Sequence, residues 1–291
     1  MKKTVFYHCI TPLHMGSGTE LGIVDLPIQR ERHTGFPKME ASGIKGAFRA
    51  LSEKLSKGKG EIDKIYGPET KENEQEASMG KLQFGDGRIL LLPVRSAKGI
   101  FAWVTCPYVL DRFIRECVEK QNRAEWEILL TKAFELIDTK AILLDSNLDT
   151  AVEQSVVILE DFKFEAETLN IEDIPERLKK HRLKKHILII TDEVFSYFCE
   201  MATEIITRIR IGDDGVVEDG ALFTEEFVPE ETVFYTVMQA KEKIFEDWKK
   251  IISYQDKNQD KDNNIIQLGG NTTLGKGFTE YWIVDREVER N

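Results

Sequence analysis

The segment IIQLGGNTTLGKGF at 265–278 restricts the fold of this chain more than any other feature. Gly270, Gly275 and Lys276 follow the spacing of a phosphate-binding loop, but Gly277 stands where that loop requires Ser or Thr. Only 14 residues of the sequence follow Gly277, so we expect no nucleotide-binding α/β domain built on this loop. Two interpretations stay open: a tight turn between two strands, or a loop whose glycines let backbone amides approach a phosphate.

A second informative segment covers residues 21–49, LGIVDLPIQRERHTGFPKMEASGIKGAFR. Basic side chains surround Asp25 in this segment, and one of them falls in the first turn of a predicted helix. These basic residues are Arg30, Arg32, Lys38 and Lys45. Cationic side chains and helix N-termini both favour anions. Together with the glycine-rich loop, the segment predicts a surface that binds a polyphosphate backbone.

The overall charge limits how such a surface is used. The chain has 51 acidic and 40 basic residues and a formal net charge of −11, whereas a simple nucleic-acid binder is usually basic. The total charge therefore argues against that class, and only the clustering argues for it. A subunit that binds RNA inside a larger assembly can be acidic overall, because only its RNA-binding groove needs a positive potential.

Composition and cysteine usage indicate a globular intracellular protein. With 291 residues, of which 41% are hydrophobic and 31% charged, the chain can form one large domain or two smaller ones. None of its four cysteines has zinc-site spacing, so we expect reduced thiols. No apolar run approaches the roughly 20 residues of a membrane helix, and the N-terminus is a poor signal peptide. We therefore expect a cytoplasmic location.

Hydrophobic periodicity predicts an α+β protein. Strands are expected at 3–10, 88–95, 99–106, 155–164, 231–239 and 278–287, and helices at 42–55, 107–120, 123–137, 191–205 and 241–254. The turn signal Asp214-Gly215 predicts a β-hairpin over 208–223. If 56–81 and 107–205 are insertions, the core order of strand, helix, strand, strand, helix, strand is that of a ferredoxin-like (RRM-like) palm with inserted helical segments. The basic run 177–186 predicts a solvated helix face, with docking to an acidic partner as the alternative.

Four side chains are candidates for catalysis, and each also has an ordinary explanation. Asp25 precedes Leu26-Pro27 and can order a turn through its own backbone. His14 reads as a hydrogen-bonded loop histidine, and Glu225 and Glu226 as solvated charges at a strand end. Brought together, they could hold a divalent metal or align an RNA 2′-hydroxyl for attack on its own phosphate. The sequence alone does not show that they converge.

Four segments carry a family resemblance. In chain order they are TPLHMGSG, GIVDLPIQRERHTGFPKMEASGIKGAFRA, LFTEEFVPEETVFY and IQLGGNTTLGKGF. They resemble the RAMP superfamily of CRISPR proteins and, more narrowly, the backbone subunits of type III-B (Cmr) effector complexes. Each motif alone is weak, but the four together are specific.

This resemblance implies a ferredoxin-like palm that stacks in copies, as a helical filament with other Cmr subunits, along one guide CRISPR RNA. A protruding hairpin thumb, which we place at 208–224, would interrupt the guide–target duplex and flip nucleotides out. The implied activity is that of an endoribonuclease which cleaves complementary target RNA in antiviral defence. The implied cofactor is a divalent metal, magnesium or manganese.

The resemblance also assigns roles to residues. Asp25 matches the essential catalytic position and is the candidate metal ligand, while His14, Glu225 and Glu226 match auxiliary positions of the active site. The RNA-binding candidates, taken from the basic cluster and from the matched guide-binding elements, are Arg30, Arg32, Lys38, Lys45, Arg49, Gly269, Gly270, Gly275 and Lys276.

Three other functions remain open at this point. The chain could be a non-catalytic structural RNA-binding subunit, with cleavage done elsewhere. It could be a stand-alone nuclease that processes repeat RNA, with His14 as general base. A nucleotide-binding enzyme is disfavoured because Gly277 breaks the phosphate-binding pattern.

Overall fold

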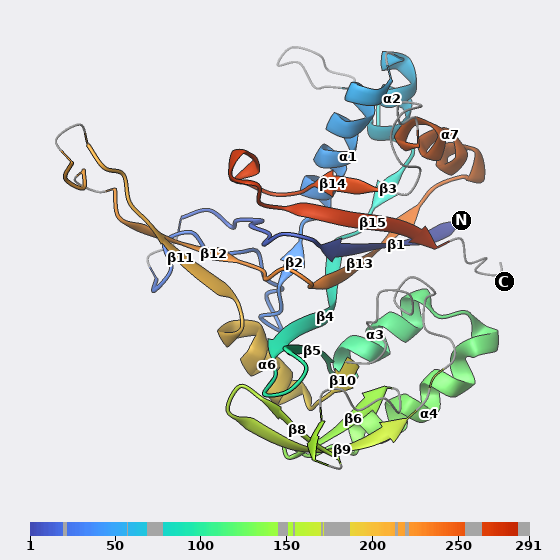
Figure 1. Cartoon of the computed structure of the whole chain (residues 1–291). Helices are drawn as coiled ribbons and strands as arrows, with labels where there is room; N and C mark the ends of the chain where they lie inside the picture. Colours follow the sequence, from blue (N-terminus) through green and yellow to red (C-terminus); the bar gives the residue numbers. More distant parts are fainter. Residues whose placement is uncertain are drawn as a thin grey trace.

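The computed structural model describes residues 1–19, 22–56, 58–68, 78–144, 151–153, 155–169, 171, 187–212, 215–218, 221–253 and 264–284. In this part of the chain most strands join one 13-stranded mixed sheet, and a separate two-stranded sheet projects from it (Figure 1). The main sheet has the strand order β14-β15-β1-β13-β4-β5-β10-β6-β9-β8-β7. The protein is therefore a mixed α/β structure with two halves joined through the β4–β5 pair.

The first half is built around β1 (Lys2–Cys9), which pairs antiparallel with β13 (Val233–Gln239) on one side and β15 (Phe278–Val284) on the other. β4 (Gly87–Arg95) pairs antiparallel with β13, and the short β14 (Ile265–Gln267) with β15. Two-residue strands, β2 (Lys38–Met39) and β3 (Gln83–Phe84), lie beside β4 and β13. The four longer strands thus alternate in direction in the order β15-β1-β13-β4.

Helices α1 (Ala41–Leu55), α2 (Lys59–Tyr66) and α7 (Glu242–Ile252) gather together beside this half (Figure 1). α1 turns Ile44 and Phe48 inward because apolar residues recur at helical spacing. The Phe48 ring lies 5.2 Å from the Trp248 ring and 5.0 Å from the Tyr281 ring, which fixes α1 against α7 and β15.

In the residues that the structure describes, the second half contains six further strands and three helices. The strands are β5 (Phe101–Thr105), β6 (Lys140–Leu144), β7 (Ala151–Glu153), β8 (Val156–Leu159), β9 (Phe162–Leu169) and β10 (Ile187–Ile189). The helices are α3 (Pro107–Cys117), α4 (Arg123–Phe134) and α6 (Asp192–Met201). Thr191, the first residue of the predicted helix 191–205, caps α6 by accepting a hydrogen bond from the Val194 amide at 3.4 Å. Short 3-10 turns lie at Lys120–Asn122 and Thr272–Leu274.

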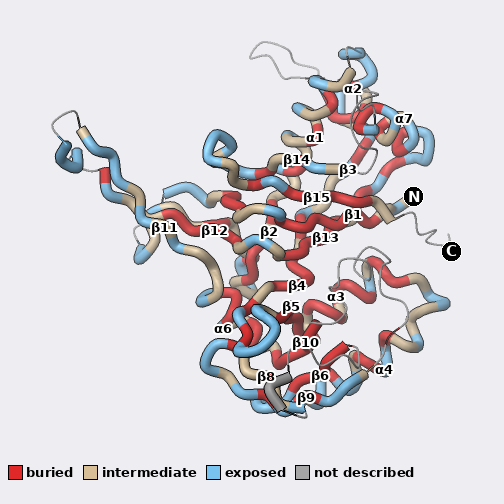
Figure 2. The backbone as a smooth tube through the Cα atoms, viewed as in Figure 1, coloured by how far each residue is buried: buried red, intermediate tan, exposed pale blue. Residues whose placement is uncertain are grey.

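The projecting sheet is a hairpin of β11 (Glu204–Arg208) and β12 (Phe223–Phe227). Its far end extends away from both halves and is mostly exposed, unlike the red, buried strands of the main sheet (Figure 2). The predicted hairpin over 208–223 falls between these paired strands. Among its described residues an isolated bridge joins Ile211 and Val217, and the Glu218 N–H donates to the Arg210 carbonyl at 2.9 Å. Of the predicted turn, Asp214 lies outside the described residues, and Gly215 has a φ of +79°.

Three local predictions were wrong. The expected single strand at 155–164 is a pair of antiparallel strands, because Glu160 adopts a φ of +47° and reverses the chain without a Gly or Pro signal. The helix expected to reach residue 205 ends at Met201, and the apolar residues that follow belong to β11. Ser42 begins the predicted helix 42–55 and is of a residue type that favours the N-cap, but it does not cap α1: the N-cap position is Glu40, with no side-chain cap hydrogen bond.

Residues 56–81 also differ from the exposed segment that their polarity predicts. They contain α2, whose Ile62, Ile65 and Tyr66 are buried in the core. The basic run 177–186 lies outside the described residues, as does most of the polar segment 255–264, whose composition predicts a solvated linker. Among the helices that the structure describes, none has the length and apolarity required to cross a membrane.

Candidate active site and RNA-binding surface

Segments from both ends of the chain meet where β12 joins the main body. Residues 25–28 lie along β12 through hydrogen bonds from Leu26 N to Thr224 O and from Glu226 N to Leu26 O, both 3.0 Å. Residues 11–16 contact the end of β12 and also the glycine-rich loop, where Gly270 N donates to His14 O at 2.9 Å. The candidate residues thus come together through backbone pairing, before any side chain is considered.

β12 separates the candidate side chains into two sets, because successive side chains of a strand point to opposite faces. Thr224 and Glu226 interact with the Asp25 segment. Glu225 and Phe227 lie instead with His14 and the glycine-rich loop. His14, Asp25 and the two glutamates, whose convergence the sequence could not show, therefore form a pair of adjacent sites that share one strand.

Asp25 presents an exposed carboxylate at the base of the hairpin. Its Oδ2 accepts hydrogen bonds from the Thr224 backbone N–H at 2.7 Å and from the Thr224 hydroxyl at 2.8 Å. The hydrogen bond from the Thr224 backbone N–H, followed by the one from its hydroxyl, holds the pKa of Asp25 below its ordinary value. The carboxylate is therefore ionised at neutral pH and held in one orientation while it faces solvent.

Glu226 is buried and receives several donors. Arg30 Nη2 lies 2.5 Å from its Oε1, and the Ile28 N–H donates to Oε2 at 3.0 Å. Arg30 Nη1 also donates to the carbonyls of Gly35 and Cys199, at 2.8 and 2.9 Å. Removing one partner of such a buried pair typically costs about 3–5 kcal/mol. Arg30, which the sequence marked as an RNA-binding candidate, thus has its guanidinium engaged within the protein.

On the other face of β12, Glu225 is surrounded by donors. His14 Nδ1 lies 2.7 Å from the Glu226 carbonyl, which can only accept, so Nδ1 carries a proton. This directs Nε2 towards Glu225, with 3.5 Å between Nε2 and Oε1. Asn271 Nδ2 donates to Oε1 at 2.5 Å, and Arg208 Nη2 lies 2.9 Å from Oε2. His14, Glu225, Asn271 and Arg208 form one polar cluster, hereafter the His14 cluster.

The glycine-rich loop can lie against this cluster only because a glycine stands at the point of closest approach. Gly269 has a φ of +71°, and a Cβ there would come within 2.2 Å of the His14 carbonyl oxygen. Lys276, at the end of the loop, places its ammonium 5.0 Å from the centre of the Phe227 ring, a cation–π contact. The loop is thus held against His14 and β12 while it keeps a cation at the surface.

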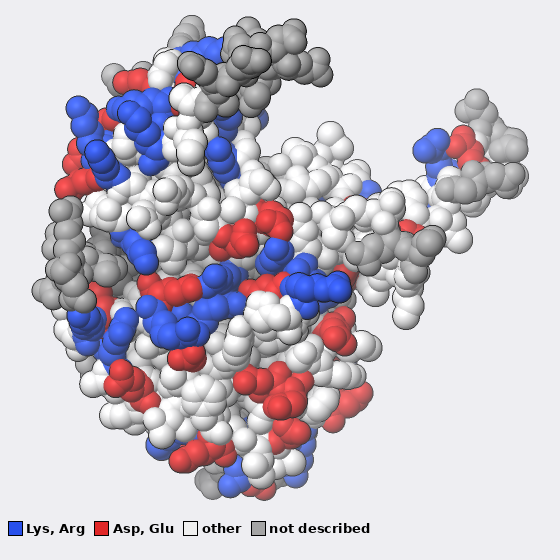
Figure 3. Space-filling model, turned by 180° about the vertical axis from the view of Figure 1, so that it is seen from behind, with Lys and Arg blue, Asp and Glu red and all other residues white. Residues whose placement is uncertain are grey.

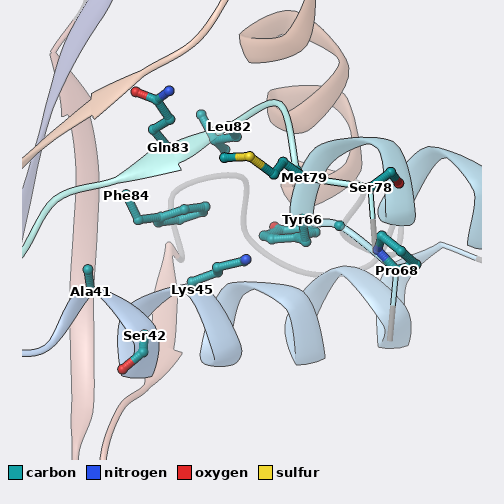
Figure 4. Close-up of a pocket in the computed structure, with 12 residues that line it drawn as sticks. Ala41, Ser42, Lys45, Tyr66, Pro68, Ser78, Met79, Leu82, Gln83 and Phe84 are labelled. Atoms are coloured by element: carbon teal, nitrogen blue, oxygen red, sulfur yellow. The ribbon is translucent and has the colours of Figure 1, made fainter. Parts of the chain in front are cut away.

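The remaining RNA-binding candidates are spread along α1 and the segment before it. Lys45 points into a pocket of 480 Å³ between Phe84 and Tyr66 (Figure 4). Arg49 is bound to Glu53, Asp63 and the Gly67 carbonyl, and Lys38 forms an ion pair with Glu40 that raises its pKa. Arg32 is exposed. Lys45, Arg32 and Lys276 are therefore better placed to meet a phosphate than Arg30, Arg49 or Lys38.

A groove of 630 Å³ runs between α1 and the glycine-rich loop. Small residues of α1 form one wall, namely Gly43, Gly46, Ala47 and Ala50, and Gly269 and Gly270 contribute to the other. Walls of this kind allow a bulky polymer to approach the backbone closely. Lys and Arg also gather in a band across the face opposite the view of Figure 1, with Asp and Glu among them (Figure 3).

The chain matches known proteins over nearly its whole length. A model of the RAMP superfamily covers residues 6–280. The chain belongs to the RAMP superfamily. It is 38% identical to the CRISPR system Cmr endoribonuclease Cmr4 of Pyrococcus furiosus, over 98% of this chain and 95% of that protein. It is 28% identical to the CRISPR system CMR subunit Cmr4 of Saccharolobus solfataricus, over 97% of each.

Solved structures agree with this membership of the RAMP superfamily. A chain of the type III-B Cmr-beta complex bound to cognate target RNA matches with a TM-score of 0.76 and 27% identity, over 97% of each chain. Oligomeric Cmr4 from Pyrococcus furiosus matches with a TM-score of 0.64 and 30% identity, again over 97% of each chain.

Sequence reasoning missed three residues of this RAMP protein's site. Thr224 directly precedes the acidic pair, but only the pairing of residues 25–28 with β12 reveals that it holds Asp25. Arg208 had no signal beyond its place in the predicted hairpin. Asn271 did offer one: it is an asparagine inside a glycine-rich loop, and it adopts a φ of +61°, a conformation that Asn tolerates.

We expect Thr224→Val to raise the pKa of Asp25 towards the ordinary value of about 3.9, because the hydroxyl that stabilises the ionised form is lost. Since the folded-state pKa is lowered, the contribution of these bonds to stability is present at neutral pH and is lost as the pH falls through that pKa. Carboxyl NMR titration of Asp25 measures the change. Thr207→Val is the matched control, because Thr207 lies opposite Thr224 in the hairpin and should leave Asp25 unaltered. An Asp25 pKa unchanged in Thr224→Val would contradict the assignment.

Proposed function

We propose that this chain is the backbone subunit of a type III-B CRISPR effector complex, binds guide CRISPR RNA and cleaves complementary target RNA. The observation that carries the proposal is the 38% identity, over nearly the full length, to a Cmr endoribonuclease. An exposed, ionised carboxylate at the base of a projecting hairpin supports it.

The architecture supports a palm and a thumb. β1, α1, β4, β13, α7 and β15 follow in the order β-α-β-β-α-β, and the sheet order β15-β1-β13-β4 is antiparallel throughout. This is the arrangement expected of a ferredoxin-like palm. The β11–β12 hairpin, with 208–224 as its far part, would be the thumb that interrupts the guide–target duplex.

The guide would lie along the groove between α1 and the glycine-rich loop. Lys45 and Lys276 flank this region and would contact phosphates, while the glycines and alanines of the groove let the RNA backbone approach. Sequence specificity would come from pairing between guide and target, so the protein needs to recognise only backbone and shape. This explains how an acidic chain can serve as an RNA-binding subunit.

Cleavage would occur at a nucleotide freed from helical geometry beside Asp25. The 2′-oxygen attacks the adjacent phosphorus, the P–O5′ bond breaks, the proton of the 2′-hydroxyl leaves to a base, and the 5′-oxygen gains a proton. Asp25 is ionised and exposed, so it can orient the 2′-hydroxyl or accept its proton. His14 and Glu225 are buried and bound to neighbours, which suits a supporting role.

A magnesium or manganese ion is part of this proposal. The described residues contain no group of three or more His, Cys, Asp or Glu that could hold a metal ion. Asp25 would therefore supply one carboxylate ligand, and RNA phosphates and water the others, a set that suits Mg²⁺. When bound, the ion would neutralise charge that develops on the phosphate. Adding Mg²⁺ to a chelator-treated complex should restore cleavage; full cleavage in the chelator alone would contradict the proposal.

The assembly would contain further copies of this chain along the guide, together with other Cmr subunits. The buried position of His14 speaks against a stand-alone nuclease that uses it as general base, because its Nδ1 is bound to the Glu226 carbonyl and its Nε2 faces Glu225. The cytoplasmic location stays a prediction from the sequence.

We expect Asp25→Ala to lower target cleavage by about a hundredfold or more, the usual contribution of a positioned proton-transfer group. Assembly and guide binding should be unchanged, because Asp25 is exposed and contacts only Thr224 among the hydrogen bonds described. A reconstituted complex with labelled target RNA measures this. Asp161→Ala, at an exposed turn before β9, is the control. Undiminished cleavage by an assembled Asp25→Ala complex would overturn the assignment.

Replacing Lys45 or Lys276 by Gln should weaken guide binding and make it less sensitive to salt. Each lost phosphate contact lowers the slope of log K against log salt concentration by about 0.7 for single strands. Guide affinity measured over a salt series tests this, with Lys163→Gln on β9 as a control in the other half of the protein. Unaltered slopes in both variants would place the guide elsewhere.

A further inference from the structure

Two consecutive residues fasten the segment that carries Asp25 to the helices of the second half. Arg30 binds the Cys199 carbonyl in α6, at 2.9 Å, as well as Glu226. Glu31 points the other way and binds Arg112 of α3, with 2.6 Å between Oε1 and Nη1. Region 107–205, predicted as an insertion, therefore supplies anchors for the segment of the candidate active site.

The Glu31–Arg112 pair is buried, with 8% and 6% of each residue exposed. Thr34 donates to the second Glu31 oxygen at 2.8 Å, so this carboxylate is well satisfied. Arg112 is not: its Nε and Nη2 are buried without a hydrogen-bond partner among the described residues, although Tyr108 lies 5.6 Å away as a cation–π neighbour. The charge of Arg112 thus depends on Glu31, and Glu31 in turn cannot lose Arg112 without leaving its buried place.

We propose that Arg112 is a positioning residue for RNA cleavage, acting through Glu31 on the backbone of residues 25–31; this rests on the proposed function. The reason is that the two ends of the segment 25–31 are held with unequal strength. At one end Asp25 is exposed and held by hydrogen bonds to Thr224, which water can replace. At the other end the buried carboxylate of Glu31 requires the guanidinium of Arg112 as its partner. When Arg112 is removed, Glu31 moves towards water. The Arg30–Glu226 pair and the Ile28 amide connect the backbone beside Glu31 to β12, so the displacement reaches the exposed Asp25 carboxylate, whose own bonds are the weaker ones.

The test compares three variants in the reconstituted, guide-loaded complex: Arg112→Met, the double variant Glu31→Met with Arg112→Met, and Arg115→Met. Arg115 lies on the same helix and pairs with Asp111 at an exposed position, so it controls for loss of an arginine from α3. Three quantities are measured: the single-turnover cleavage rate at saturating target, the affinity for a non-cleavable 2′-deoxy target, and the thermal unfolding midpoint.

Arg112→Met should lower the cleavage rate about tenfold to a hundredfold, as a displaced catalytic group does, with target affinity within about twofold. The double variant should regain both the unfolding midpoint and the rate, since no buried charge is left to displace the segment. An Arg112→Met complex with a lowered midpoint but an unaltered rate would reduce the pair to a purely structural role and overturn the proposal, as would a double variant that regains the midpoint but not the rate. A wild-type complex without cleavage would instead refute the proposed function.

Discussion

The buried Glu226 is the residue on which the arrangement of the site depends. Its side chain accepts from Arg30 and from the Ile28 amide, and its carbonyl accepts from His14 Nδ1. Its amide donates to Leu26, which sets residues 25–28 alongside β12. One residue thus joins the first loop, the loop that carries His14 and the base of the hairpin. The buried carboxylate needs the donors on Arg30 and Ile28, and the backbone groups of Glu226 need His14 and Leu26 as partners; together these bonds keep the three segments in one arrangement.

That arrangement distributes the charges of the site by their exposure. The carboxylates of Glu225 and Glu226 are buried and bound to arginines, whereas that of Asp25 faces solvent on a backbone that its buried neighbours hold in place. A reactive group needs access to substrate and a fixed position at once, and these demands conflict on an ordinary surface loop. Here the first loop gains rigidity from its buried end and keeps its carboxylate free at the other.

Much of the framework could be predicted from local sequence. The helix at 42–55 and the strand pair at 88–95 and 99–106 appear within a few residues of their expected bounds, because their apolar residues repeat at helical or strand spacing. The prediction of a single strand at 155–164 was wrong because the chain reverses at Glu160. This residue adopts a left-handed conformation, and no Gly or Pro in the sequence indicates a turn there. The partners of Arg30 and Arg49 could not be predicted either, since each arginine binds groups more than ten residues away.

The sequence by itself determined the family to which the chain belongs and which residues are candidates to carry its chemistry. Residue type and local spacing are enough to recognise the candidate residues, namely Asp25, His14, the acidic pair and the glycine-rich loop. Only the tertiary structure decided that β12 separates Asp25 from the His14 cluster, that Thr224 holds Asp25, and that Arg30 and Arg112 serve as internal anchors. The physical reason is that burial and backbone pairing join residues about 80 to 200 positions apart, and these long-range contacts decide which charges are paired inside the protein and which remain for RNA.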